Sequence, residues 1–373
     1  MRFRPVEAQI DLSAIAANVA ALSELAGDAA LMAVVKADAY GHGAVEVARA
    51  VKRAGAGWLG VALVEEGVGL REAGIDGPIL VLSEPPLAAA EAVAAARLTP
   101  VVYRERWIDA LAQAVAKSDS NAPLPVHLKV DTGMHRAGCD PEEALGLAKA
   151  VASHGELVLE GLMTHFAVAD ELDHPATEAQ LGSFRAVLAE LEDAGVTPPI
   201  VHAANSAAAM TRPEARYDLV RCGIALYGIP PAPALDGRLD LVPAMSLSAE
   251  VSQVRRVDRG DGVSYGLRYR LERPATIATV PIGYADGVPR RLGHVGGEVL
   301  VGGRRRSIAG TVTMDQIMVD CGDDEVSPGD DVVLIGRQGV EEITASDWAV
   351  LLDTIAYEIT CGIGARVPRR YRA

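Results

Sequence analysis

The sequence predicts an α/β fold in which a (β/α)8 TIM-type barrel is followed by a C-terminal all-β domain. Up to about residue 230, short apolar runs alternate with longer helical patterns rich in Ala, Glu and Leu. Strands that alternate with helices pair in parallel, and eight such units close into a barrel. Beyond that point, short β-rich runs are separated by Gly, Asp and Pro turns, which indicates a second domain.

Eight apolar runs bounded by turn-forming residues are the candidate barrel strands. They are Leu31–Val35, Trp58–Leu63, Ile79–Leu82, Pro100–Tyr103, Val126–Val130, Leu157–Met163, Pro199–His202 and Tyr217–Arg221. The helical patterns between them include Ala44–Ala54, Val64–Ala73, Leu87–Ala96, Glu142–Ala152 and Glu178–Ala194. Ahead of the barrel we expect an extra strand, Ala8–Leu12, and a helix, Ser13–Leu25.

A Pro-rich linker, Ile229–Pro233, divides the chain into predicted domains 1–234 and 235–373, with residues 1–12 as the extra strand. The β runs of the second domain are Met245–Val257, Thr276–Ile282, Glu298–Val301, Ser307–Val312, Gln316–Val319 and Asp331–Ile335. Only Ala345–Ile355 has a helical pattern there, with Thr344 as its expected cap.

Composition and charge narrow the function classes. The formal net charge of −15 argues against a nucleic-acid backbone or an anionic membrane as partner. The start of the chain lacks the apolar core of a signal peptide. The four cysteines are far apart, so we expect reduced thiols in a cytoplasmic protein. The eight histidines show no metal-ligand spacing, so we expect no bound catalytic metal.

Lys36 follows the first barrel strand directly and is the leading candidate for a reactive group. Burial lowers a lysine pKa, and such an amine can form a Schiff base with an aldehyde or ketone. The alternative is a lysine that bends out into water. Barrel enzymes place their chemistry at C-terminal strand ends, where any single polar group can also be structural. The other strand-end candidates are Asp38, Tyr40, Lys129, Asp131, Arg136, Thr164, His165, His202, Asn205, Ser206, Arg221, Gly223 and Ile224.

Two of these segments suit a phosphate group. Asn205 and Ser206 open a short helix, where backbone N–H groups and a hydroxyl can face an anion. Gly223 follows the eighth strand and permits close backbone approach. Loops after strands seven and eight often bind phosphate in this fold. Together with a reactive lysine, this pattern fits a pyridoxal phosphate Schiff base.

Two other motif matches lack the required context. Gly55–Gly60 matches the dinucleotide-binding pattern, but it leaves a helix and enters a strand, which is the reverse of the required order. Gly262–Gly266 matches the nucleophile elbow of serine hydrolases, but Leu267–Arg270 continues a β region without the helix that an elbow needs.

Several blocks of the sequence resemble the alanine racemase family. The resemblance runs in order from residue 8 to about residue 366 and covers both domains. Its blocks are Val34–Gly43, Leu128–Gly138, His202–Ser206, Arg221–Ile224, Tyr265, Gly283–Gly287 and Met314–Gln316.

The resemblance implies a homodimer with shared active sites and pyridoxal 5'-phosphate bound to Lys36. Alanine would displace Lys36 to form an external aldimine, and two bases would exchange its α-proton on opposite faces. Lys36 would serve one face and Tyr265 of the partner subunit the other. His165 and Arg221 would connect Tyr265 to the pyridine nitrogen. The D-alanine product would supply peptidoglycan synthesis.

The remaining roles are also implied by the resemblance. Tyr40, Asn205, Ser206, Gly223, Ile224 and Tyr357 would bind the cofactor. Arg136, Met314 and Asp315 would bind or border the substrate carboxylate. His202 and Lys129 would be support residues, with Lys129 as a possible carbamate. The alternatives are a broad-specificity amino-acid racemase and a fold-related pyridoxal phosphate decarboxylase, while a cofactor-carrier protein would typically keep only the barrel.

Overall fold

The structure is a computed structural model that describes residues 3–118 and 122–373. Its internal contacts divide the chain into two units. The β unit comprises residues 3–13, 40–43 and 243–373, and the barrel unit comprises Ala14–Ala39 and Ala44–Val242. The β unit therefore takes its strands from both ends of the chain. The functional boundary between residues 234 and 235 stays a prediction.

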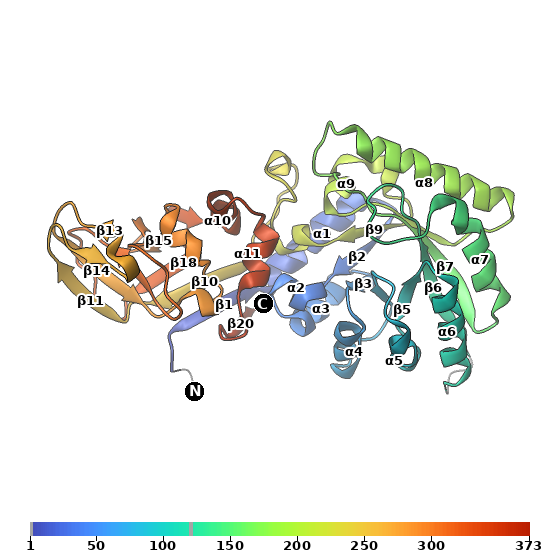
Figure 1. Ribbon diagram of the computed structural model, residues 1–373, viewed down its shortest axis with the longest axis horizontal. Coiled ribbons are helices and arrows are strands. Elements are labelled where there is room, and N and C mark those ends of the chain that lie inside the picture. The colour runs from blue at the N-terminus through green and yellow to red at the C-terminus, as the bar shows by residue number, and fades with distance from the viewer. Residues whose placement is uncertain (1–2, 119–121) are drawn as a thin grey trace. The chain divides into compact units, whose positions relative to one another are not determined.

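The barrel unit contains eight parallel strands, which confirms the predicted (β/α)8 fold (Figure 1). Neighbours in the chain are neighbours in the sheet, and the last strand pairs with the first. Hydrogen bonds from Asp218 N to Val201 O and from Arg221 N to Ala204 O link the two final strands and close the ring. The strands are β2 (Ala30–Val34), β3 (Trp58–Val61), β4 (Ile79–Val81), β5 (Thr99–Val102), β6 (Leu124–Lys129), β7 (Leu157–Met163), β8 (Ile200–His202) and β9 (Leu219–Cys222).

Helices surround these strands on the outside, as Figure 1 shows for α4 to α8. The helices are α1 (Leu12–Ala26), α3 (Ala44–Arg53), α4 (Val64–Glu72), α5 (Ala90–Ala95), α6 (Glu105–Ala116), α7 (Ala144–Ser153), α8 (Pro175–Asp193) and α9 (Ser206–Thr211), with 3-10 turns at Leu87–Ala89, Pro141–Glu143, Pro213–Ala215, Ile224–Tyr227 and Pro233–Leu235. A buried cluster, Met32, Leu80, Val101, Met163 and Leu219, takes one residue from each of five strands. Parallel strands covered on both faces need continuous apolar runs, which is why the sequence revealed them.

The segment that follows Lys36 is a left-handed turn, α2 (Lys36–Tyr40). Ala37, Asp38, Ala39 and Tyr40 all have φ between 51° and 54°. Left-handed helical geometry costs roughly 1–2 kcal/mol per non-glycine residue, so surrounding contacts must hold it. Glu66 accepts the Ala37 N–H at 2.6 Å, and Asp38 accepts the Ala44 N–H at 2.7 Å.

The β unit contains a seven-stranded sheet and two smaller sheets. The large sheet has the order β16, β15, β18, β10, β1, β20, with β19 paired to β18. Its strands are β16 (Arg304–Ser307), β15 (Glu298–Val301), β18 (Asp331–Gln338), β10 (Met245–Glu250), β1 (Val6–Asp11), β20 (Arg369–Arg372) and β19 (Glu341–Ile343). The smaller sheets contain β11 (Gln253–Val257), β14 (Ala275–Val280) and β17 (Ile317–Asp320), and then β12 (Gly262–Val263) and β13 (Tyr269–Arg270).

Two expectations for the β unit were wrong. Thr344 does cap α10 (Ala345–Leu352), but Asp353 adopts φ 58° and ends that helix, and a second helix, α11 (Ala356–Gly362), follows. The run Ser307–Val312 is not a strand, because the strand lies earlier, at Arg304–Ser307, and Gly310 has φ 82°. Three 3-10 turns also occur, at Tyr265–Leu267, Tyr284–Asp286 and Arg290–His294. In the described part of the chain, we find no helix with the length and apolar character required to span a bilayer.

Candidate functional site

Arg221 is the central residue of the barrel site. It lies at the C-terminal end of β9 and is only 3% exposed. Its Nη1 lies 3.0 Å from His202 Nδ1, and its Nη2 lies 3.0 Å from His165 Nδ1. Nη2 also donates to the carbonyl oxygens of Thr164 at 2.8 Å and Ala203 at 2.9 Å. The guanidinium therefore joins the ends of β7, β8 and β9.

Both histidines bonded to Arg221 are neutral. Burial, followed by the positive charges of Arg221, Lys129, Arg136 and Lys36, holds the pKa of His165 well below its usual value. Burial, followed by His127, Arg221 and Lys129, does the same to the pKa of His202. Because an arginine only donates, the Nδ1 atoms of both rings accept its protons, and each neutral ring carries its own proton on Nε2.

Lys129 belongs to the same group of cations. Burial, assisted by Arg221, Arg136 and Lys36, lowers its pKa to about 8, although Asp131 opposes the shift. Most of its amine is therefore still protonated near neutral pH, but a minor fraction is neutral, far more than for an ordinary lysine. Asp131 receives three backbone N–H bonds, from Gly133, Met134 and His135, at 2.9 to 3.0 Å, and these outweigh partial burial and lower its pKa.

The predicted phosphate segments also meet. Asn205 Oδ1 accepts the Ala208 N–H at 2.9 Å, which caps α9 as expected. Ser206 Oγ accepts the Gly223 N–H at 2.9 Å, which joins the turns after β8 and β9. Ser206, Gly223 and Ile224 are all buried.

This donor set fits pyridoxal phosphate. The positive charges of Lys36, Lys129, Arg136 and Arg221 all act on His165, while Asp131 is the one carboxylate among the groups that shift the Lys129 pKa. Four cations held together repel one another, so an anion placed among them is strongly favoured. The amine of Lys36 suits an aldehyde, and the guanidinium of Arg221 suits a ring nitrogen that accepts a hydrogen bond.

The β unit gathers the remaining predicted residues around the loop 311–316. Thr311 donates to Tyr265 O at 3.0 Å, Tyr284 N donates to Thr313 O at 2.9 Å, and Ala285 N donates to Met314 O at 3.0 Å. The side chains of Tyr265 and Met314 are 72% and 53% exposed. Separate motif blocks thus form one surface with two exposed side chains available for contacts.

A buried carboxylate supports this surface. Asp286 is fully buried and accepts hydrogen bonds from both Nη atoms of Arg4, at 2.8 Å, and from the Gly283 N–H, at 3.0 Å. Arg366 lies 3.4 Å from Asp286 and donates to Asp315 at 2.7 Å. Elsewhere in the β unit, the rings of Tyr40 and Tyr357 lie 5.9 Å apart.

Sequence reasoning missed two polar residues on the barrel strands, His127 and Glu160. His127 Nδ1 lies 2.7 Å from His202 Nε2, and His127 Nε2 lies 3.3 Å from Glu160 Oε2. His127 is fully buried in β6, where a histidine within an apolar run was the available signal. Within residues 3–118 and 122–373, no group of three or more His, Cys, Asp or Glu side chains is placed to hold a metal ion.

Comparison with known proteins matches both parts of the chain. Residues 10–231 match the alanine racemase N-terminal domain family, and residues 244–371 match the alanine racemase C-terminal domain family. An alanine racemase of Symbiobacterium thermophilum is 50% identical over 99% of this chain and 97% of its own.

Solved structures agree. The alanine racemase of a D-cycloserine-producing Streptomyces lavendulae superimposes with a TM-score of 0.93 at 44% identity, covering 100% of this chain and 98% of its own. The Bacillus anthracis alanine racemase with bound L-Ala-P gives a TM-score of 0.93 at 40% identity, covering 100% of this chain and 96% of its own.

The neutral buried histidines predict a loss of stability in acid. The folded pKa of His202 lies below its unfolded value of about 6.5, so the unfolded chain binds the extra proton. Below that pH, each such group lowers the free energy of unfolding by up to about 1.4 kcal/mol per pH unit. We expect His202→Asn to flatten this fall, as measured by urea unfolding of the cofactor-free protein from pH 7 to pH 5.

His135→Asn is the matched control, because the His135 side chain is 85% exposed and makes only a surface contact with Asp131, at 3.7 Å. It should keep the wild-type dependence on pH. An equal acid sensitivity of wild type and His202→Asn would contradict a neutral, buried His202.

Proposed function

This chain belongs to the alanine racemase family, and we propose that its Lys36 and Tyr265 exchange the α-proton of alanine on opposite faces of the substrate. The protein interconverts L-alanine and D-alanine and depends on pyridoxal phosphate, as its family does. The observation that supports these residue roles best is the group of cations around the neutral ring of His165.

Pyridoxal phosphate supplies an aldehyde that condenses with an amine and a ring that withdraws electrons from the α-carbon. Lys36 would hold it covalently, since this residue follows β2 by two positions and begins the left-handed turn α2. Tyr40, Asn205, Ser206, Gly223, Ile224 and Tyr357 would hold the phosphate end. The bond between Ser206 and Gly223 and the capped start of α9 support this assignment.

Arg221 would face the ring nitrogen and limit the electron withdrawal. Burial lowers its pKa to about 10, which still leaves it a cation at neutral pH. A cation that only donates cannot give up a full proton to the ring nitrogen, so that nitrogen stays unprotonated. A weaker electron sink favours rapid return of the proton to carbon over side reactions such as transamination.

Proton exchange on two faces needs one acid–base group on each. Lys36 would remove the proton from D-alanine, and Tyr265 would remove it from L-alanine. The exposed side chain of Tyr265 and the Thr311 bond to its backbone support a role in contact with another surface. Arg136 and the backbone N–H of Met314 would orient the substrate carboxylate, with Asp315 held by Arg366 beside them.

We also propose an oligomeric state, a set of partners and a compartment for the protein. We infer a homodimer in which each site combines Lys36 of one subunit with Tyr265 of the other, and no nucleic-acid or membrane partner. The free thiols of Cys139, Cys222, Cys321 and Cys361 support a reducing cytoplasm. D-alanine would there supply the synthesis of peptidoglycan.

Tyr265→Phe should separate the two half-reactions. In D₂O, proton NMR should show that the variant still exchanges the α-proton of D-alanine, because Lys36 remains. Exchange from L-alanine and racemisation should fall by about 10²-fold or more, because the second acid–base group is gone. Chiral analysis of the same samples measures the inversion directly, and equal loss of exchange from both enantiomers would contradict the assigned faces.

Mixing two inactive variants tests the shared site. Lys36→Ala and Tyr265→Phe each damage every site of their own homodimer. In a mixed dimer, one site would combine the intact Lys36 of one subunit with the intact Tyr265 of the other, so racemisation should reappear after co-refolding. Absence of recovery in a confirmed mixed dimer would place both residues of a site on one chain.

Lys129 should form a carbamate with dissolved carbon dioxide. Its neutral amine can attack CO₂, forming an N–C bond and releasing one proton, and the new carboxylate would neutralise the repulsion with Arg136 and Arg221. Protein equilibrated with ¹³C-bicarbonate should show one carbamate carbon by NMR. Lys129→Arg should abolish that signal, whereas Lys117→Arg, at an exposed position, should keep it.

A further inference from the structure

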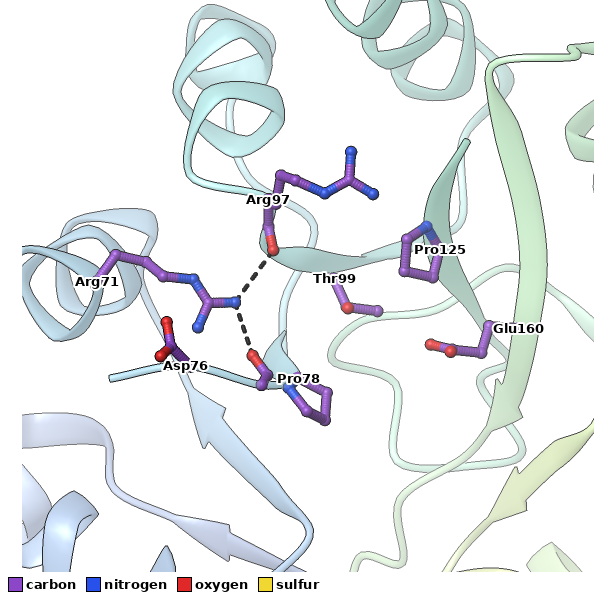
Figure 2. A pocket seen from close by; sticks show the side chains of 8 residues that line it. Arg71, Asp76, Pro78, Arg97, Thr99, Pro125 and Glu160 are labelled. Carbon is purple, nitrogen blue, oxygen red and sulfur yellow. Dashed lines mark hydrogen bonds between the residues drawn. The ribbon is translucent and has the colours of Figure 1, made fainter. Parts of the chain in front are cut away.

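A pocket of about 360 Å³ lies at the N-terminal end of the barrel strands, the end opposite Arg221. Its lining residues Gly77 and Pro78 precede β4, and Arg97 precedes β5. Arg71 crosses one side of the pocket and donates to Gly77 O and Arg97 O, while Glu160 lies across from it (Figure 2). Glu160 is the one lining residue that bonds to a buried histidine.

A series of hydrogen bonds leads from Arg221 to Glu160 in this pocket, and each group donates to the next. Because arginine only donates, His202 Nδ1 must be an acceptor, so the neutral ring carries its proton on Nε2. That N–H points at His127 Nδ1, which lies 2.7 Å away and must therefore be unprotonated. The remaining proton of His127 sits on Nε2 and faces the Glu160 carboxylate at 3.3 Å. This series of hydrogen bonds therefore assigns the tautomers of both His202 and His127.

A β-bulge beside His127 places Glu160 within reach of the imidazole. In the pairing of β6 with β7, Val126 lies opposite Leu159 and His127 lies opposite Gly161, so Glu160 is the extra residue of a β-bulge. Bulges redirect side chains, and this one places the carboxylate at the ring.

Gly161 provides the space for the imidazole. A Cβ added there would lie 2.5 Å from His127 Nδ1, which is closer than real Cβ contacts allow. The Trp58 ring, whose centroid lies 5.3 Å from that of the His127 ring, packs against the apolar cluster of the barrel, so His127 lies beside apolar side chains. The bulge and the glycine together accommodate the buried His127 ring and its hydrogen bonds.

We propose that His127 and Glu160 are positioning residues that fix the tautomer of His202 and, through it, the orientation of Arg221. Without an acceptor at His127, the Nε2–H of His202 is buried and unsatisfied, and the ring can relieve this only by weakening its bond to Arg221. Arg221 then holds its remaining donors less firmly toward whatever it binds. This inference rests on the proposed role of Arg221 facing the cofactor ring.

The first experiment reads the tautomers directly. The full-length protein, labelled with ¹⁵N-histidine, is examined by long-range ¹H–¹⁵N correlation with and without pyridoxal phosphate. Both His127 and His202 should show the neutral Nε2–H pattern, assigned by loss of peaks in His127→Asn and His202→Asn. An Nδ1–H tautomer or an imidazolium at either ring would overturn the proposal.

Variants at Glu160 test whether a change at the pocket alters the hydrogen bonding of His127 and His202. Glu160→Gln should shift the Nε2–H resonance of His127 and, to a smaller extent, that of His202. Asp76→Asn removes a carboxylate that lines the same pocket without bonding to His127, so it is the matched control and should move neither resonance. Identical spectra for Glu160→Gln and the control would overturn the proposed link.

Kinetics then separate positioning from folding. His127→Asn keeps an acceptor near the Nδ1 position, whereas His127→Leu removes it. We expect kcat to fall on the order of 10-fold in His127→Leu but to stay within about 3-fold of wild type in His127→Asn, with KM for alanine unchanged. Should His127→Leu fail to fold, the Glu160→Gln spectra and kcat decide the question.

Equal kcat in wild type, His127→Leu and Glu160→Gln would show that the positioning role is wrong. Failure of the proposed catalytic function would appear differently, as absence of α-proton exchange from alanine by the wild-type protein itself.

Discussion

The buried guanidinium of Arg221 is the interaction on which the barrel site depends. A cation taken out of water is costly unless its donors are satisfied, and here two carbonyl oxygens and two imidazoles accept them. Those acceptors belong to the ends of β7 and β8, so the charge holds neighbouring strand ends in one arrangement. Apolar packing stabilises the rest of the barrel, but it has no comparable directional control over side-chain orientation.

Much of the fold could be predicted because a buried strand is recognisable from its own short stretch of sequence. Buried parallel strands require apolar runs, and each of the eight runs lies within two residues of an observed strand at both ends. Helix α11 was missed because Asp353, a non-glycine residue, takes a left-handed conformation that no sequence pattern marks. The left-handed turn after Lys36 was hidden for the same reason, since it contains Ala37, Asp38 and Ala39 rather than glycine.

Those site residues could be predicted that follow a barrel strand or lie in a recognised motif block. Arg221, His165 and His202 follow strands and were found in this way, and the structure brings them together. Glu160 was not predicted, because its orientation follows from a bulge between β6 and β7. Such a bulge is determined by the pairing of two segments about thirty residues apart in the chain, which neither segment reveals alone.

The position of β1 has a consequence for how the protein is made. This strand, Val6–Asp11, is synthesised before any barrel strand, yet its sheet neighbours are β10, which begins at Met245, and β20, which ends at Arg372. A nascent chain therefore carries an unpaired strand with alternating buried residues at least until β10 has been synthesised. The large sheet is complete only once β20 has been synthesised, so the barrel strands are all made well before the β unit can fold to completion.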